Sequence, residues 1–463
     1  MSDTLIEPPE RVLSTLNPDG TRRWMRPKAA MGKWWQRRRV VAWTLMILFT
    51  AIPWIKIGGR PVMLLDVMHR EFVFFGTTFQ PTEVLLLALL LIGIFFGIFL
   101  ITAILGRGWC GWACPQTVYL EFLYRPIERW AEGNHSGNSR KKVALWRKVM
   151  KYILFLVFSL HLSNTFLAYF AGPRTVLDWS FSSPGEHPAA FAIVMGVTAL
   201  MMFDFVFFRE QMCTLVCPYA RLQSALLDRD SLIIGYDEKR GEPRGRKSHT
   251  DDGLPHGDCI DCKLCVAACP TGIDIRDGLQ LECIACTQCV DACDTVMDKI
   301  DRPRGLIRFA SQNTLTGMAH KFFRPRVVVY PLLLLGIFGG LAYGLSNRAS
   351  SEAMVLRNQS STWAESGDFV VQPVSVRVSN RSDVARTYTL VIAAPSEVRG
   401  QPFPLTLEPY GMQMVNLPVF TPTSSFVDGK AMLRMVLRDG DDFEQELEQT
   451  LFGPTSGPAE GEE

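Results

Sequence analysis

"CIDCKLCVAACP" occupies residues 259–270, and "CIACTQCVDACD" follows at residues 283–294. Both stretches have the spacing C-x2-C-x2-C-x3-C, which is typical of the bacterial loop that binds a cubane 4Fe-4S cluster. Three cysteines of one tight loop bind three irons, and the fourth thiolate comes from elsewhere in the fold. Two copies of the spacing therefore predict two 4Fe-4S clusters, held in a ferredoxin domain of the α+β class. Because such clusters carry single electrons, this domain is predicted to transfer electrons.

The fourth ligand of each cluster is expected from the other run, as in two-cluster ferredoxins. The predicted sets are Cys259, Cys262, Cys265 and Cys293 for the first cluster, and Cys283, Cys286, Cys289 and Cys269 for the second. Zinc is an alternative, because zinc sites also use C-x2-C pairs. Zinc takes its four ligands as two separated pairs, which does not account for the same spacing twice. Asp294 replaces the usual proline after the last cysteine, a difference that concerns only the second loop.

The rest of the chain has the composition of a membrane protein. Of 463 residues, 48% are hydrophobic, and they are concentrated in five runs: 40–55, 84–105, 152–171, 189–208 and 327–345. A helix needs roughly 20 apolar residues to cross a hydrocarbon core about 30 Å thick. The runs therefore predict a five-helix transmembrane bundle, in which the first run is short and contains Pro53.

Lysine and arginine predict the orientation of this bundle. They are concentrated before the first run and between the second and third, whereas loops 57–83 and 172–188 have few. Basic loops stay on the cytoplasmic side, so the N-terminus and segment 209–326 are expected inside and the region after 345 outside. Ten of the twelve cysteines lie in 209–326, and the reducing cytoplasm favours metal ligation over disulfides. No nucleic-acid partner is expected.

Two further cysteine pairs follow apolar runs, "CGWACP" at 110–115 and "CTLVCP" at 213–218. Proline suits the first turn of a new helix, so each site predicts a helix end followed by an interfacial helix. Positions i and i+4 share a helix face, so each pair could present its two sulfurs side by side. Three interpretations stay open: ordinary buried cysteines, a redox-active disulfide, or a soft-metal site. The candidate catalytic and metal-binding residues are Cys110, Cys114, Cys213 and Cys217.

Weaker candidates lie in the spans and in the first outer loop. His161 and Asp204 fall within apolar runs, where polar groups usually face a bundle interior or a cavity. A hydrogen bond to a neighbouring helix is the simpler interpretation. Met63, Met68 and His69 are candidate copper contacts, although methionine is common in apolar packing.

From residue 352 the pattern changes to strand-type alternation interrupted by Pro and Gly, which predicts roughly seven strands in a β-sandwich. The expected organisation is a basic cytoplasmic segment (1–39), four spans with two C-x3-C-P sites (40–208), the cluster domain (209–326), a fifth span (327–346), an outer domain (352–453) and a disordered tail (454–463).

With these features together, the chain resembles the cytochrome c oxidase accessory protein family known as CcoG, FixG or RdxA. The resemblance covers almost the whole chain, including "GGRPVMLLDV" at 58–67, "REFVFFGTTFQP" at 70–81, both C-x3-C-P sites and the double cluster motif. It implies a bacterial inner-membrane protein with an immunoglobulin-like periplasmic domain. It also implies a role in maturation of cbb3-type haem-copper oxidase, together with copper chaperones or transporters and other assembly factors.

The leading hypothesis is a cupric reductase that passes electrons from the clusters to copper at the paired cysteines. One alternative is a quinol-linked membrane electron conduit, resembling the polyferredoxins of nitrate and nitrous oxide respiration. Another is a redox-sensing scaffold for oxidase assembly. No nucleotide-binding glycine pattern is present, so an external cytoplasmic electron donor is expected.

Overall fold

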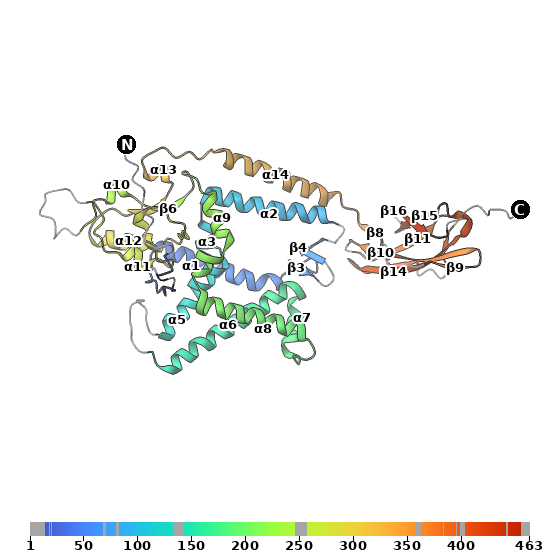
Figure 1. The fold of residues 1–463 in the computed structure, drawn as a ribbon, viewed down its shortest axis with the longest axis horizontal. Coiled ribbons are helices and arrows are strands. Elements are labelled where there is room, and N and C mark those ends of the chain that lie inside the picture. The colour runs from blue at the N-terminus through green and yellow to red at the C-terminus, as the bar shows by residue number, and fades with distance from the viewer. Residues whose placement is uncertain are drawn as a thin grey trace. The chain divides into compact units, whose positions relative to one another are not determined.

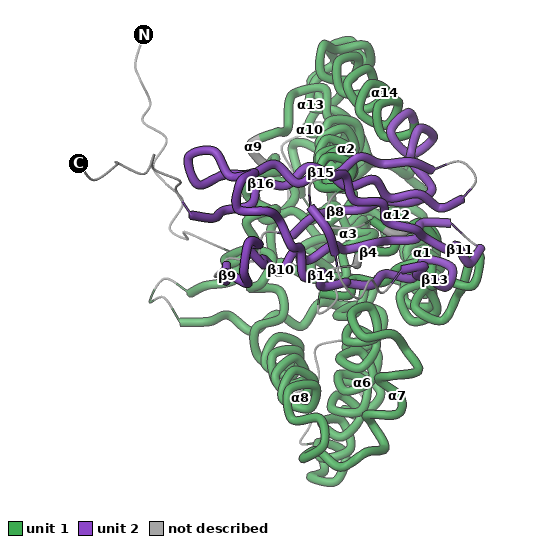
Figure 2. Tube along the Cα trace, turned by 90° about the vertical axis from the view of Figure 1, so that its right-hand side faces the viewer, with its two compact units in different colours: residues 1–342 green, residues 343–463 purple. Residues whose placement is uncertain are grey.

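The computed structural model divides the chain into two compact units, residues 1–342 and 343–463 (Figure 2). It describes residues 14–454 except 18, 20, 68–70, 80–82, 133–142, 246–256, 357–362, 383, 395, 399–402 and 441–442. Met68, His69 and the tail from residue 455 therefore lie outside the described residues.

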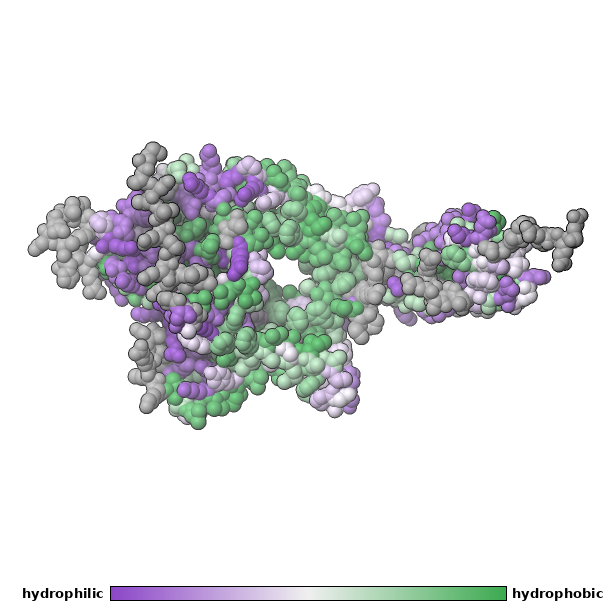
Figure 3. All heavy atoms as spheres, in the orientation of Figure 1, coloured by the Kyte–Doolittle hydropathy of each residue, from purple (hydrophilic) through white to green (hydrophobic). Residues whose placement is uncertain are grey.

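Four helices of the described residues are long and apolar enough to cross a membrane. They are α2 (Val84–Leu105), α6 (Leu145–Ala171), α8 (Pro188–Met202) with its π-helical continuation η3 (Phe203–Phe208), and α14 (Pro325–Ser346). Their apolar side chains form the green region of the surface in Figure 3. Four of the five predicted apolar runs are thus confirmed as membrane-length helices.

The first apolar run belongs to α1 (Lys33–Ala51), which ends in the 3-10 turn η1 (Ile52–Trp54) containing Pro53. This helix begins before residue 40, and its early turns carry Lys33 and arginines at 37–39. These charges explain why α1 is not among the four most apolar helices.

Short strands connect α1 to α2. They are β1 (Lys56–Ile57), β2 (Arg60–Pro61), β3 (Met63–Asp66), β4 (Glu71–Phe74) and β5 (Thr77–Phe79). The last three form an antiparallel sheet in the order β3-β4-β5. Met63, one of the three candidate copper contacts, is half-buried in β3. The other two, Met68 and His69, lie outside the described residues.

Short helices follow α2, α6 and η3. They are α3 (Gly108–Trp112), α4 (Pro115–Tyr119), the π-helix η2 (Leu120–Tyr124), α5 (Arg125–Glu132), α7 (Pro173–Phe181), the π-helix η4 (Met212–Val216) and α9 (Pro218–Leu226). Both prolines of the C-x3-C-P sites begin helices, at Pro115 and Pro218, which confirms the predicted helix breaks.

The cluster domain combines a two-stranded antiparallel sheet with short helices (Figure 1). Its elements are β6 (Ile233–Tyr236), α10 (Glu238–Gly241), α11 (Leu264–Ala268), η5 (Ile275–Asp277), α12 (Gln288–Lys299), β7 (Ile307–Ala310) and α13 (Gln312–Leu315). Ile234, Met297 and Leu306 are buried in the same core as Cys259 and Cys265, and four more cysteines pack against it: Cys269, Cys283, Cys289 and Cys293. These six cysteines are therefore part of the domain's packing.

The second unit consists of two antiparallel sheets, in the orders β12-β14-β10-β8 and β13-β11-β15-β16, with β9 paired to β10. The described strands are β8 (Ser351–Leu356), β9 (Ala364–Ser366), β10 (Phe369–Asn380), β11 (Arg386–Ile392), β12 (Glu397–Val398), β13 (Leu405–Leu407), β14 (Met412–Pro422), β15 (Lys430–Arg438) and β16 (Glu444–Phe452). Val376 and Leu417 from one sheet share a buried core with Tyr388 and Met435 from the other. The unit is therefore a two-layer β-sandwich.

Strand β15 provides a matched test of this core. Met435 is fully buried, whereas Met432 on the opposite face is 55% exposed. We expect Met435→Ala to lower the opening free energy of the sandwich by about 2–5 kcal/mol and Met432→Ala to change it by less than about 0.5 kcal/mol. Hydrogen exchange on the full chain measures both, and equal effects would contradict the two-layer core.

Candidate functional site

The two cysteine runs adopt the same local conformation. Asp261 and Lys263 in the first run have positive φ angles of 51° and 56°, and Ala285 and Thr287, at the equivalent positions of the second run, have 53° and 63°. Non-glycine residues rarely adopt this left-handed region, and such strain is concentrated at functional sites. In each loop, the backbone therefore turns sharply on either side of the second cysteine, just before α11 or α12 begins.

The neighbours of two of the thiols agree with the predicted crossed sets, which stay a prediction. Burial, together with the nearby Cys265 thiolate, the Asp294 carboxylate and Cys259, raises the pKa of Cys293 to about 12. In the other set, burial and the thiolates of Cys269 and Cys283 are among the causes that raise the pKa of Cys286 to about 12. Cys293 of the second run thus lies near thiols of the first run, and Cys269 of the first run lies near thiols of the second.

Buried cations next to the second set favour an anionic occupant. Arg38 is only 2% exposed, its guanidinium lowers the pKa of Cys286 against the effect of burial, and its Nη1 has no hydrogen-bond partner in the described residues. Arg107 donates to the Leu281 carbonyl, while its buried Nε also has no partner among the described residues. A cluster ligated by four thiolates would supply the negative charge that these guanidiniums face, so the residues present fit it.

The cysteines of each C-x3-C-P site do not share one helix face, contrary to the expectation from their spacing. Cys110 lies within α3 and Cys213 within η4, but Cys114 and Cys217 are extended residues that cap the next helix. Proline disfavours the α conformation of the residue before it, so the first helix of each site ends before the second cysteine.

The fold nevertheless places the four thiols, from two distant segments, near enough to influence one another's ionisation, although they do not converge on a single-ion position. The Cys213 thiol interacts with those of Cys114, Cys110 and Cys217, and Cys110 interacts with Cys114 and Cys217. Burial raises the pKa of Cys110 to about 11 and raises that of Cys213 further. We call these four residues the four-thiol site.

The four-thiol site lies against the loop of the second cluster. Cys110, Ile284 and Cys286 form one buried apolar group, with Cys213 and Tyr219 packed against it. The Cys110 thiol also donates to Gln223 Oε1 at 2.9 Å. Cys286, a predicted ligand of the second cluster, and Cys110 of the four-thiol site therefore belong to the same buried apolar group.

Gly111 permits this close approach. A Cβ atom at this position would lie 2.5 Å from the Ile284 carbonyl oxygen and 2.9 Å from the Ala285 carbonyl carbon. Arg38 Nε donates to the Gly111 carbonyl at 2.9 Å from the other side. The turn between Cys110 and Cys114 is thus clamped between α1 and the cluster loop.

The second cluster run also anchors α1. The Asp291 carboxylate accepts hydrogen bonds from the backbone amides of Trp34, at 3.1 Å, and Trp35, at 2.7 Å. A carboxylate at a helix N-terminus satisfies amides that have no partner within the helix and complements the helix dipole. The sequence offered no signal for this contact, because Asp291 lies in α12 and its partners are far away in the chain.

A buried charge network joins the helical segment that follows the first cysteine pair to the two residues just before the second pair. Arg125 pairs with Glu121 at 2.5 Å and with Glu210 at 3.5 Å, and Arg209 pairs with Glu128 at 2.7 Å. Removing one partner of such a buried pair typically costs about 3–5 kcal/mol. The network therefore fixes the relative position of the cysteine pairs.

The remaining candidates are less central. His161 is exposed on α6, so it does not face the interior of the described helices, as its place in an apolar run had suggested. Asp204 is half-buried, and its Oδ1 has no hydrogen-bond partner among the described residues. No group of three His, Cys, Asp or Glu side chains in the described residues converges on a single-ion position.

Comparisons with known families agree with this geometry. Residues 208–312 match the family described as a 4Fe-4S dicluster domain, and residues 87–132, which include Cys110 and Cys114, match the family described as a 4Fe-4S binding domain. Together with the membrane-length helices, these matches define an iron-sulfur electron-transfer protein of membrane character.

Relatives then identify the family. The chain is 32% identical to the nitrogen fixation protein FixG of Rhizobium meliloti, over 93% of each chain. It is 35% identical to protein RdxB of Cereibacter sphaeroides over 85% of each chain, and 33% identical to RdxA of the same organism over 79% of this chain and 80% of the relative. The protein belongs to the FixG/RdxA/RdxB family.

Gly111→Ala tests the contact between the four-thiol site and the cluster loop. Since backbone must move to admit the new methyl group, we expect a loss of about 1–3 kcal/mol in stability and an altered EPR spectrum of the reduced second cluster. Gly108→Ala is the control, because its Cβ would meet only Leu105 Cβ, at 3.4 Å. Two variants indistinguishable from the wild type would contradict the contact.

Paired cysteine variants test the crossed ligand sets. Cys293→Ala alone, and Cys293→Ala combined with Cys259→Ala, should each retain about half of the iron, because both residues are expected to serve one cluster. Cys293→Ala combined with Cys283→Ala should lose nearly all of it. Iron analysis and EPR distinguish these cases, and complete loss in the first pair would exclude the proposed sets.

Proposed function

We propose that this protein is a membrane-bound electron-transfer protein that reduces Cu(II) to Cu(I) during assembly of a cbb3-type oxidase. The supporting observation is the packing of the four-thiol site directly on the loop of the second cluster group. The clusters, when bound, supply one-electron carriers. The copper substrate and the oxidase come from the family resemblance described above.

The four-thiol site suits copper in its reduced state. Burial is the first cause of the raised pKa values of Cys110, Cys114 and Cys213, so these groups remain neutral thiols until a cation offsets the charge of the thiolates. Thiolate ligands select Cu(I) among the copper states. One electron added to Cu(II) gives Cu(I), which this site would stabilise, and the thiol protons pass to water.

We propose that α1 is a fifth span. Its start is held by Asp291, and Arg38 contacts Gly111 just beyond the end of α2. Near its other end, the Phe49 carbonyl accepts a hydrogen bond from Tyr169 Oη at 2.7 Å, close to the end of α6. Because α6 starts beside α5, where Lys151 pairs with Glu132 at 2.9 Å, α1 extends over the same depth as α6.

Five spans give the orientation that the basic loops favour. We therefore propose a bacterial inner-membrane location with the N-terminus and clusters in the cytoplasm and an immunoglobulin-like sandwich in the periplasm. In this arrangement, the sandwich is available to oxidase assembly factors and copper chaperones or transporters, while an external cytoplasmic donor supplies electrons.

One observation favours a second function. The family that matches residues 87–132 is described as 4Fe-4S binding, and four thiols are also the ligand set of a cubane. An iron-sulfur unit at the four-thiol site would add a third carrier, which favours the quinol-linked conduit over copper reduction.

Replacing all four thiols with serine separates these functions. Protein purified without oxygen and reduced with dithionite should convert Cu(II) to Cu(I), and the quadruple variant should fall to the rate of cluster-free protein while keeping its iron. Chelation of Cu(I) by a coloured ligand gives the rate, and metal analysis gives the iron content. Loss of about a third of the iron instead would indicate a third cluster and contradict the copper site.

A further inference from the structure

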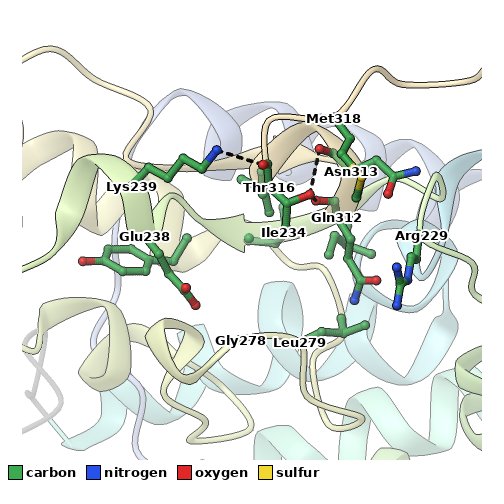
Figure 4. A pocket seen from close by; sticks show the side chains of 14 residues that line it. Arg229, Ile234, Glu238, Lys239, Gly278, Leu279, Gln312, Asn313, Thr316 and Met318 are labelled. Carbon is green, nitrogen blue, oxygen red and sulfur yellow. Dashed lines mark hydrogen bonds between the residues drawn. The ribbon is translucent and has the colours of Figure 1, made fainter.

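A cavity of about 470 Å³ lies on the side of the cluster domain formed by β6, α10, α13 and the turn at Gly278 (Figure 4). Pockets of this size hold cofactors and other small molecules. None of the twelve cysteines lines it, so this cavity is separate from the cluster loops and from the four-thiol site.

One side chain connects the cavity to the second cluster group. Ile234 lines this cavity and also lines the small internal space bounded by the four cysteines of the predicted second set and by Cys265. It is only 1% exposed. A molecule in the cavity would therefore be separated from the predicted second cluster by a single layer of side chain.

The lining combines apolar walls with two cations and the carboxylate of Glu238. Ile233, Leu279 and Met318 contribute apolar surface, and the last two are 44% and 51% exposed. Figure 4 shows Arg229 and Lys239 at opposite ends of the cavity, with Lys239 Nζ donating to the Thr316 carbonyl at 2.8 Å. Neither cation forms an ion pair within the described residues, so both remain able to bind an anion.

Gln312 lies between the two cations along the cavity. Its side chain points into the space in Figure 4 and forms none of the hydrogen bonds found among the described side chains. An amide at this position can donate to and accept from the ring edge of a heteroaromatic ligand. The lining thus offers apolar surface for a flat ring, an amide for its edge and, at either end, a cation for a phosphate.

We infer that this cavity binds a reduced flavin mononucleotide, which supplies electrons to the second cluster. The inference rests on the proposed electron-transfer function, in which the donor is external. Flavins carry out one-electron chemistry as well as hydride transfer, so a flavin can reduce a one-electron cluster, which a hydride donor alone does not do. The phosphate supplies the anion for Arg229 or Lys239.

The electrons balance without another reactant. Oxidation of one flavin hydroquinone to the quinone releases two electrons and two protons. Each of the two clusters accepts one electron, and the protons pass to water. One flavin therefore reduces the protein fully in two successive steps.

Fluorescence quenching of flavin mononucleotide by the full-length protein in detergent tests binding without any turnover. Reversing the charge of the cation that binds the phosphate, by Arg229→Glu or by Lys239→Glu, should weaken binding about tenfold, as expected for loss of a charge-assisted hydrogen bond. Gln312→Trp should block the cavity. Lys299→Glu, an equal charge change at the exposed end of α12, is the control and should bind as the wild type does. Absent binding, or equal weakening in the control, would overturn the inference.

Cluster reduction gives a second and independent readout. Photoreduced flavin mononucleotide should bleach the cluster absorbance of the wild type and of Lys299→Glu, and much more slowly that of Gln312→Trp, whereas dithionite should reduce all three equally. Slow bleaching of the wild type by the flavin, with normal Cu(II) reduction after dithionite, would contradict the cavity and leave the proposed function intact. Normal bleaching without any Cu(II) reduction would support the cavity and contradict the proposed function.

Discussion

The backbone contact between Gly111 and the Ile284–Ala285 peptide is the constraint on which the site depends. A side chain at position 111 would place its first carbon 2.5 Å from the Ile284 carbonyl oxygen, so the two loops touch only because this residue is glycine. The contact joins the end of an apolar helix to a cluster loop. It places Cys110 in the same buried group as Cys286, and this proximity makes an electron path from the cluster domain to the four-thiol site physically reasonable.

The contacts around Gly111 fix the relative position of the two loops. Asp291 fixes the start of α1 on the cluster domain, and Arg38 of the same helix reaches the Gly111 carbonyl. On the other side, the buried pairs of Arg125 with Glu210 and of Arg209 with Glu128 join the two segments that carry the thiols. The cluster domain is therefore built into the helical part of its unit, so small displacements in either part are expected to alter both.

The cysteine spacing was sufficient to predict the iron-sulfur domain, and the apolar runs were sufficient to predict the four membrane-length helices. The prolines predicted the helix starts at Pro115 and Pro218. The contact at Gly111 was not predictable, because no local pattern relates that residue to Ile284 across such a distance in the chain. The spacing of Cys110 and Cys114 was misleading about their conformation, because the following proline takes precedence over the helical period. His161 was also misleading, because the inward polar face of α6 is formed instead by Ser159 and Ser163, which hydrogen-bond to Tyr124 and Thr198.

The central claim is that electrons leave the cluster domain through the four-thiol site. Rapid freeze-quench EPR after mixing dithionite-reduced protein, freed of excess reductant, with Cu(II) tests it most directly. The account predicts that the Cu(II) signal and the reduced-cluster signal disappear together, at a rate that falls sharply in Gly111→Ala. Loss of the Cu(II) signal while the clusters remain reduced, or at the same rate in Gly111→Ala, would contradict it.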